Sequence, residues 1–133
     1  MKTWLAVLLV CLLAALSLPA LGDQQKANVP KYDATKEVTL KGVVTEVVDR
    51  TCPVSGGMGA HLMLKLNDGS SIEVHLAPTK FVKSYELVFN KGDQIEVIGS
   101  KVTFEDKETI FARQVTRGND SFVFRDDKGK PVW

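Results

Sequence analysis

The sequence predicts an all-β protein with one short helix, built as a five-stranded Greek-key barrel with a C-terminal hairpin arm. Three observations predict it. Apolar residues alternate along several short segments, a helical pattern interrupts them after the third segment, and turn-forming residues rich in glycine and aspartate separate them. The barrel occupies residues 37–117 and the arm residues 118–133.

The first strand, residues 38–49, indicates how the barrel closes. Its apolar residues fall on even positions and then shift phase to Val47, with Gly42 near the change. A phase shift beside a glycine indicates a bulge or a sharp bend. A bent strand can pair with two neighbours, so we expect one half to pair with the second strand and the other half with the fourth.

The second and third strands, residues 61–66 and 71–76, form a predicted hairpin. Leucine, isoleucine and valine alternate with polar residues in both, which places one apolar face inward. Residues 50–60, which contain Pro53 and three glycines, predict an irregular loop before this hairpin.

The length of the hairpin turn decides how the two histidines of the chain face each other. If Gly69 is left-handed in a three-residue loop, Leu66 pairs with Ser70 and His61 lies directly opposite His75. A five-residue loop would keep the same faces but shift the histidines out of direct opposition.

Residues 78–90 predict a helix of about three turns that plugs one end of the barrel. Phe81, Tyr85, Val88 and Phe89 recur at helical spacing and would share its apolar face. Two further strands follow, at 93–102 and 108–117. The arm after them contains Phe122, Phe124 and Trp133.

The order strand, strand, strand, helix, strand, strand is that of the OB-fold. The segments VTLKGVV, LNDGSSIEVHL, KGDQIEVIGSKV and IFARQV resemble those of small exported bacterial OB-fold proteins, the BOF-like proteins. The combination EVHLAP, KGDQIEVIGS and IFARQV also resembles a domain of the magnetosome-associated MamS and MamX proteins. The chain has no Cys-x-x-Cys-His motif, so this second resemblance implies no haem.

Residues 1–22 predict a cleaved export signal. Lys2 provides the positive start, residues 4–16 the apolar stretch, and small residues precede a cleavage position at Asp23. We therefore expect a periplasmic or secreted protein with no membrane anchor after cleavage. Residues 23–36 would form a flexible polar leader.

Removal of the signal changes both the charge and the cysteine content. Loss of Lys2 leaves 16 basic residues against 16 acidic ones, so the mature chain is neutral. Proteins that bind nucleic acid through phosphates usually carry a clustered positive excess. Cys11 also leaves, so Cys52 is the one mature cysteine, either free, metal-bound or paired between chains.

The outer face of the predicted hairpin carries the candidate ligand-binding residues. They are His61, Met63, Lys65, Glu73 and His75. Binders of single-stranded nucleic acid stack bases on aromatic residues and follow the backbone with basic ones. This face has no Phe, Tyr or Trp, so we do not expect nucleic acid to be the partner, despite the fold.

Cys52, His61 and His75 form a candidate metal site, because thiolate and imidazole are good ligands for copper and zinc. Met58 in the preceding loop and Met63 on the hairpin would add soft sulfur atoms nearby. The opposing interpretation is that two surface histidines share a hairpin by chance.

No pattern of a catalytic nucleophile with its base, paired carboxylates or a phosphate-binding loop stands out, so we expect no enzyme. The leading hypothesis is an exported OB-fold binding module whose ligand contacts the 50–61 loop and the outer face of the 61–76 hairpin. A small molecule, a metal ion or a periplasmic protein could be that ligand. The alternatives are a structural or protein-interaction module that acts through the C-terminal arm, and a nucleic-acid-binding OB-fold.

Overall fold

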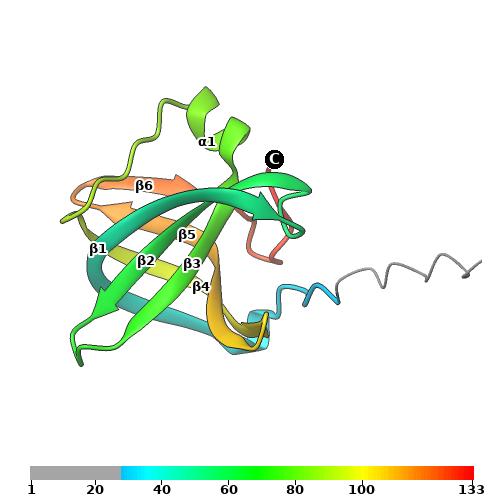
Figure 1. Ribbon diagram of the computed structural model, residues 1–133, viewed down its shortest axis with the longest axis horizontal. Coiled ribbons are helices and arrows are strands. Elements are labelled where there is room, and N and C mark those ends of the chain that lie inside the picture. The colour runs from blue at the N-terminus through cyan, green and yellow to red at the C-terminus, as the bar shows by residue number, and fades with distance from the viewer. Residues whose placement is uncertain (1–27) are drawn as a thin grey trace, which may run out of the picture.

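The computed structural model describes residues 28–133, and the predicted signal peptide at 1–22 lies outside them. The chain forms a closed five-stranded barrel with one short helix and a sixth strand (Figure 1). Its elements are β1 (Glu37–Cys52), β2 (Gly57–Leu66), β3 (Ser71–Pro78), α1 (Thr79–Ser84), β4 (Gln94–Phe104), β5 (Lys107–Arg117) and β6 (Asp120–Val123). Strands β1, β2, β3, β5 and β4 pair in that circular order, which is the OB-fold circuit. The predicted fold class is confirmed.

Strand β1 is a single bent strand that serves two neighbours, as its phase shift predicts. Residues 37–43 pair with β4, and residues 42–52 pair with β2. The register with β2 shifts between Val44 and Glu46, where the bulge lies. Gly42 stands at the point where both pairings overlap, and an added Cβ there would lie 2.9 Å from the side chain of Leu64. The bend therefore requires a residue without a side chain.

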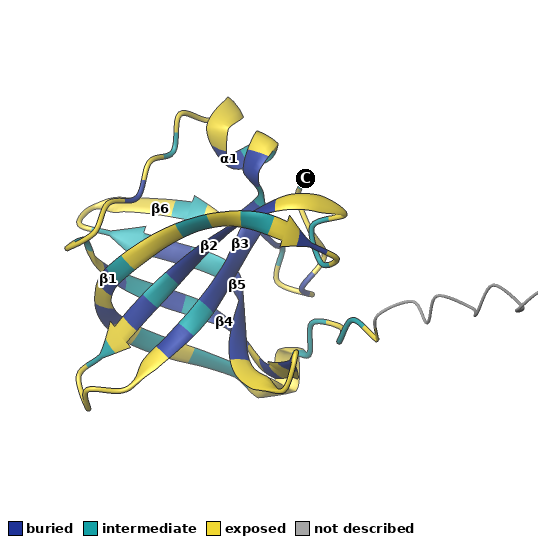
Figure 2. Ribbon diagram, viewed as in Figure 1, coloured by how far each residue is buried: buried dark blue, intermediate teal, exposed yellow. Residues whose placement is uncertain are grey.

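The hairpin of β2 and β3 has the three-residue turn, the first of the two alternatives that the sequence leaves open. The amide of Leu66 donates to the carbonyl of Ser70 at 2.8 Å, and Gly69 is left-handed with φ of 87°. This register places His61 directly opposite His75. It also explains the apolar inner face, where Leu62, Leu64, Val74 and other core residues are buried (Figure 2).

The predicted irregular loop at 50–60 is wrong over most of its length. Strand β1 continues to Cys52 and β2 begins at Gly57, so only residues 53–56 form a turn. The amide of Ser55 donates to the carbonyl of Cys52 within this turn, and Gly56 has φ of 70°. The ladder between the strands outweighs the local glycine content, because each added pair satisfies backbone groups on both strands.

The predicted three-turn helix is also wrong in length, since α1 covers only Thr79–Ser84. Glu86 is left-handed, with φ of 53°, and the amide of Leu87 donates to the carbonyl of Val82. These features form a Schellman cap, which ends a helix. Tyr85 and Val88 are consequently exposed instead of buried.

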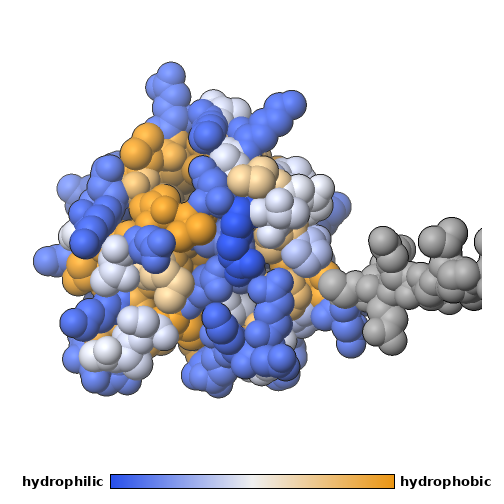
Figure 3. All heavy atoms as spheres, viewed as in Figure 1, coloured by the Kyte–Doolittle hydropathy of each residue, from blue (hydrophilic) through white to orange (hydrophobic). Residues whose placement is uncertain are grey.

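An apolar surface patch lies between α1 and β1 on the face seen in Figure 3. A hollow lined by Val47, Lys83 and Val88, among others, falls between these elements.

The C-terminal arm packs against the barrel that precedes it. Strand β6 pairs with the C-terminal half of β5, and Phe124 is 1% exposed within the hydrophobic core. Arg125 lies over the rings of Tyr32, Phe111 and Trp133. The arm thus covers apolar surface of the protein itself.

The described part of the leader, residues 28–36, is held by the barrel and the arm. Its last three residues, Ala34–Lys36, form a turn of 3-10 helix. The backbone amide of Asp33 donates to Ser100 on β4, and the hydroxyl of Tyr32 donates to Glu37. Within the described residues, no helix is long and apolar enough to cross a membrane.

Candidate metal centre

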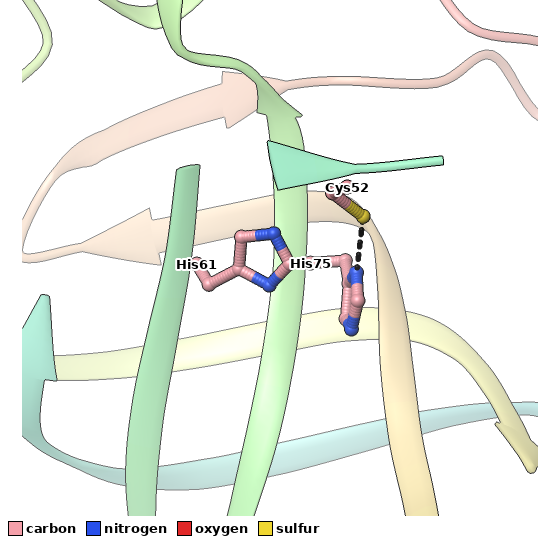
Figure 4. Close-up of side chains that lie close together, drawn as sticks. All are labelled: Cys52, His61 and His75. Atoms are coloured by element: carbon pink, nitrogen blue, oxygen red, sulfur yellow. Dashed lines mark hydrogen bonds between the residues drawn. The ribbon is translucent and has the colours of Figure 1, made fainter. Parts of the chain in front are cut away.

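Three side chains from three strands converge on the outer side of the barrel wall (Figure 4). Cys52 comes from the end of β1, His61 from β2 and His75 from β3. The ring centroids of the two histidines are 4.1 Å apart, and one ligand atom from each of the three residues lies within 4.8 Å of the others. We call these residues the Cys-His-His cluster. It lies on the β2–β3 face, between the β1–β2 and β4–β5 turns, where OB-folds bind their ligands.

The two histidines are buried, although the sequence predicts them on an open outer face. His61 is 1% exposed and His75 is 5% exposed. The reason is the parallel pairing of β3 with β5, which sets Phe111 opposite His75. The ring of Phe111 lies 5.3 Å from that of His75, and the ring of Phe104 lies 5.7 Å from it. These two aromatic side chains close the face over the cluster.

The hydrogen bond between His61 and Glu73 determines which imidazole nitrogen carries the proton. The Nδ1 atom of His61 lies 2.8 Å from Oε1 of Glu73. Burial acts to raise the pKa of Glu73, but the hydrogen bonds from Arg50 and the attraction of Arg50 and the two histidines together hold that pKa below its usual value. An ionised carboxylate can only accept, so Nδ1 of His61 donates.

The other nitrogen of His61 then carries a free lone pair. Burial lowers the pKa of His61, and the attraction of Glu73 offsets this only in part, so the ring is neutral at neutral pH. Its Nε2 atom is therefore unprotonated, and it is buried without any hydrogen-bond partner. An orphaned buried acceptor is costly in a native protein, and a metal ion would satisfy it.

Cys52 and His75 provide the remaining ligand atoms of the cluster. The Sγ atom of Cys52 lies 3.5 Å from Nδ1 of His75, and Cys52 itself is 1% exposed. Burial, followed by repulsion from His61, lowers the pKa of His75 to about 4. Both imidazoles are consequently neutral at pH 7, which is the form that binds metals.

Arg50 and Glu105 cover the cluster from the solvent side. Arg50 donates to Oε1 of Glu73 through Nη2 at 2.6 Å and through Nε at 3.1 Å. Its Nη1 atom lies 3.4 Å from the carboxylate of Glu105, at the β4–β5 turn. The guanidinium therefore links the strand that carries Cys52 to the opposite turn.

Gly59 leaves space beside the ligand atoms that a larger residue would fill. A Cβ atom at this position would lie 3.0 Å from Nε2 of His61, 3.1 Å from Cβ of Cys52 and 2.7 Å from Oγ of Ser55. The free lone pair of His61 thus points into a region bordered by backbone and by Cys52.

The other predicted site residues lie outside the cluster. Met58 is half exposed, and its sulfur accepts from the hydroxyl of Thr51 at 3.6 Å. Met63 pairs with Glu73 and is partly buried. Lys65 is exposed at the far end of the hairpin, opposite Ser71. The structure thus brings together Cys52, His61 and His75, with Glu73 beside them.

Sequence reasoning did not place Arg50, Phe104, Phe111, Gly59 or Glu105 in the site. Arg50 could have been found, because it lies two residues before Cys52 on a strand and so shares its face. The two phenylalanines could not, since they reach the cluster through the β3–β5 pairing, whose register no local signal predicts.

The arrangement is chemically a three-ligand site with one sulfur and two nitrogen donors. Thiolate and imidazole are preferred by copper and zinc over harder cations. The contact between Glu73 and His61 matches the carboxylate that commonly orients a metal-binding histidine from behind.

Comparison with known proteins identifies a family for this chain. The model of the MamS/MamX magnetosome protein family matches residues 36–122, which span the barrel and most of β6. No curated protein sequence matches the chain at a significant level.

Three solved structures resemble the chain at low sequence identity. The N-terminal domain of PriB protein from Thermoanaerobacter tencongensis is 16% identical, with a TM-score of 0.46, over 65% of this chain and 99% of that chain. A small single-stranded DNA-binding protein from Streptomyces coelicolor is 16% identical, with a TM-score of 0.47, over 68% of this chain and 96% of that chain. The tRNA agmatidine synthetase TiaS is 21% identical, with a TM-score of 0.47, over 77% of this chain and 24% of that chain.

Proposed function

The chain belongs to the MamS/MamX magnetosome protein family, and from this and the buried cluster we propose that it is a metal-binding module that holds one copper or zinc ion. Cys52, His61 and His75 would be the ligands, with Glu73 behind His61. The proposed role is binding rather than catalysis, in the periplasm or outside the cell, where the export signal would direct the chain.

The observation that carries the proposal is the Nε2 atom of His61. The only N–H of this neutral ring donates to Glu73, and the remaining nitrogen is buried with no partner. Evolved cores seldom leave such an atom unsatisfied. The other two members of the cluster are the thiol of Cys52 and the ring of His75, and both are groups that bind metal ions in proteins.

The electrostatic state of the cluster also supports the proposal. Burial keeps both imidazoles neutral at pH 7, so a metal ion displaces no proton from either ring. The ion would displace only the thiol proton of Cys52. The Sγ atom of Cys52 already lies 3.5 Å from Nδ1 of His75, so two of the three ligand groups are in contact.

The position of the cluster argues against the nucleic-acid alternative. An OB-fold that binds a single strand presents aromatic and basic side chains on the β2–β3 face. Here that face carries the two buried histidines, and Phe104 and Phe111 pack against His75 instead of standing free for stacking.

Native mass spectrometry of the reconstituted protein tests the proposal. The wild type should bind one Cu(I) or one Zn(II), and Cys52→Ser and His75→Gln should each lose that ion at the same metal concentration. Met58→Leu is the matched control, because this residue lies on the same hairpin but half exposed, outside the cluster. Equal loading of wild type, Cys52→Ser and His75→Gln would disprove the site.

A further inference from the structure

We infer that the Cys-His-His cluster is selective for Cu(I) over Zn(II), an inference that rests on the proposed metal-binding function. The first ground is the number of ligands. The described residues supply three ligand atoms within 4.8 Å of one another. Cu(I) is stable with three soft or borderline ligands, whereas zinc in proteins almost always takes four and completes its set with water when the protein provides three.

The second ground is that the site offers a fourth, water ligand little support. Cys52 and His61 are each 1% exposed, and His75 is 5% exposed. The rings of Phe104 and Phe111 form the wall beside His75, at 5.7 and 5.3 Å. A buried water needs two to four polar partners, and aromatic rings provide none.

Among the polar groups beside the cluster, Glu73 faces both histidines through its Oε1 atom, and this atom is already engaged. It accepts from Nδ1 of His61 and from two nitrogens of Arg50. A water that took one of these places would break the contact that orients His61. The cluster therefore favours an ion that needs no additional ligand.

Paired competition titrations test this inference. Reduced protein is titrated without oxygen with Cu(I) against a chromophoric copper(I) chelator, and separately with Zn(II) against a chromophoric zinc chelator. We expect Cu(I) to bind at least about 100-fold more tightly than Zn(II), as expected for a soft three-ligand set. Cys52→Ser should abolish that preference, and Met58→Leu should leave it unchanged.

The outcomes separate the inference from the proposed function. If Zn(II) binds as tightly as Cu(I) or more tightly, and Cys52→Ser weakens both, the selectivity is wrong and the metal site stands. If neither ion binds more weakly to Cys52→Ser than to wild type, the proposed function itself fails. A preference for Cu(I) that is lost with Cys52 supports both.

Discussion

Glu73→Gln isolates the contribution of the carboxylate behind His61. Glutamine keeps the length and shape of the side chain, but it removes the charge and can turn its amide group either way. With the amide nitrogen toward His61, Nδ1 would become the acceptor and the proton would move to Nε2, where the metal must bind. The substitution should therefore disfavour the ligand form of the ring without removing any ligand atom.

The size of the effect follows from the contacts that Glu73 makes. It accepts from Nδ1 of His61 at 2.8 Å and from Nη2 of Arg50 at 2.6 Å. Loss of a carboxylate that orients a metal-binding histidine typically lowers metal affinity by about 10- to 100-fold. That range corresponds to about 1.4 to 2.7 kcal/mol of binding free energy.

A competition titration against a chromophoric chelator measures this change in affinity. Glu105→Gln is the matched control, because its carboxylate meets the same Arg50 at 3.4 Å and forms no hydrogen bond with either imidazole. It should bind metal within about threefold of wild type, since an exposed ion pair contributes little. If Glu73→Gln also stays within about twofold of wild type, Glu73 does not set the state of His61 and the reasoning is wrong.

Three further outcomes concern the stability of the metal-free protein. Leu64→Ala and Val97→Ala, at two fully buried positions, should each lower the free energy of unfolding, measured in urea, by about 2 to 4 kcal/mol. Lys65→Ala should lower it by less than about 0.5 kcal/mol. Equal losses in all three variants would refute the assignment of strand faces. The pKa of His75 is lowered from 6.5 to about 4. The neutral ring therefore contributes fully to the free energy of unfolding above pH 6.5. This contribution, on the order of 3 kcal/mol, is lost as the pH falls toward 4. His75→Phe should flatten the pH profile of unfolding, and an unchanged profile would contradict the buried neutral ring. Phe124→Ala should cost about 3 to 5 kcal/mol, whereas a loss below about 1 would mean that the arm is dispensable for the fold.

The parts of the structure that the sequence predicts well are those set by neighbouring residues. The turn at 67–69 contains Gly69, and a three-residue turn determines the pairs from Lys65 with Ser71 to His61 with His75, beyond which the register shifts. The bend in β1 can also be predicted from neighbouring residues, because the phase of its apolar residues changes where the bulge occurs.

The parts that it predicts poorly depend on contacts between distant segments. The apolar spacing at 81–89 suits a helix, but a left-handed Glu86 ends α1 at Ser84, and glutamate carries no local signal for that conformation. Burial of the histidines depends on β5 pairing with β3, which brings Phe111 against His75. Alternation alone can place His61 and His75 on the outer face, but cannot indicate what covers it.

X-ray absorption spectroscopy of the metal-loaded protein tests the central claim most directly, because it reports the atoms bound to the ion. For a metal held by Cys52, His61 and His75, we expect one sulfur and two imidazole nitrogens in the coordination shell. Cys52→Ser should remove the sulfur from that shell. A shell of nitrogen and oxygen alone in the wild-type protein would contradict the site.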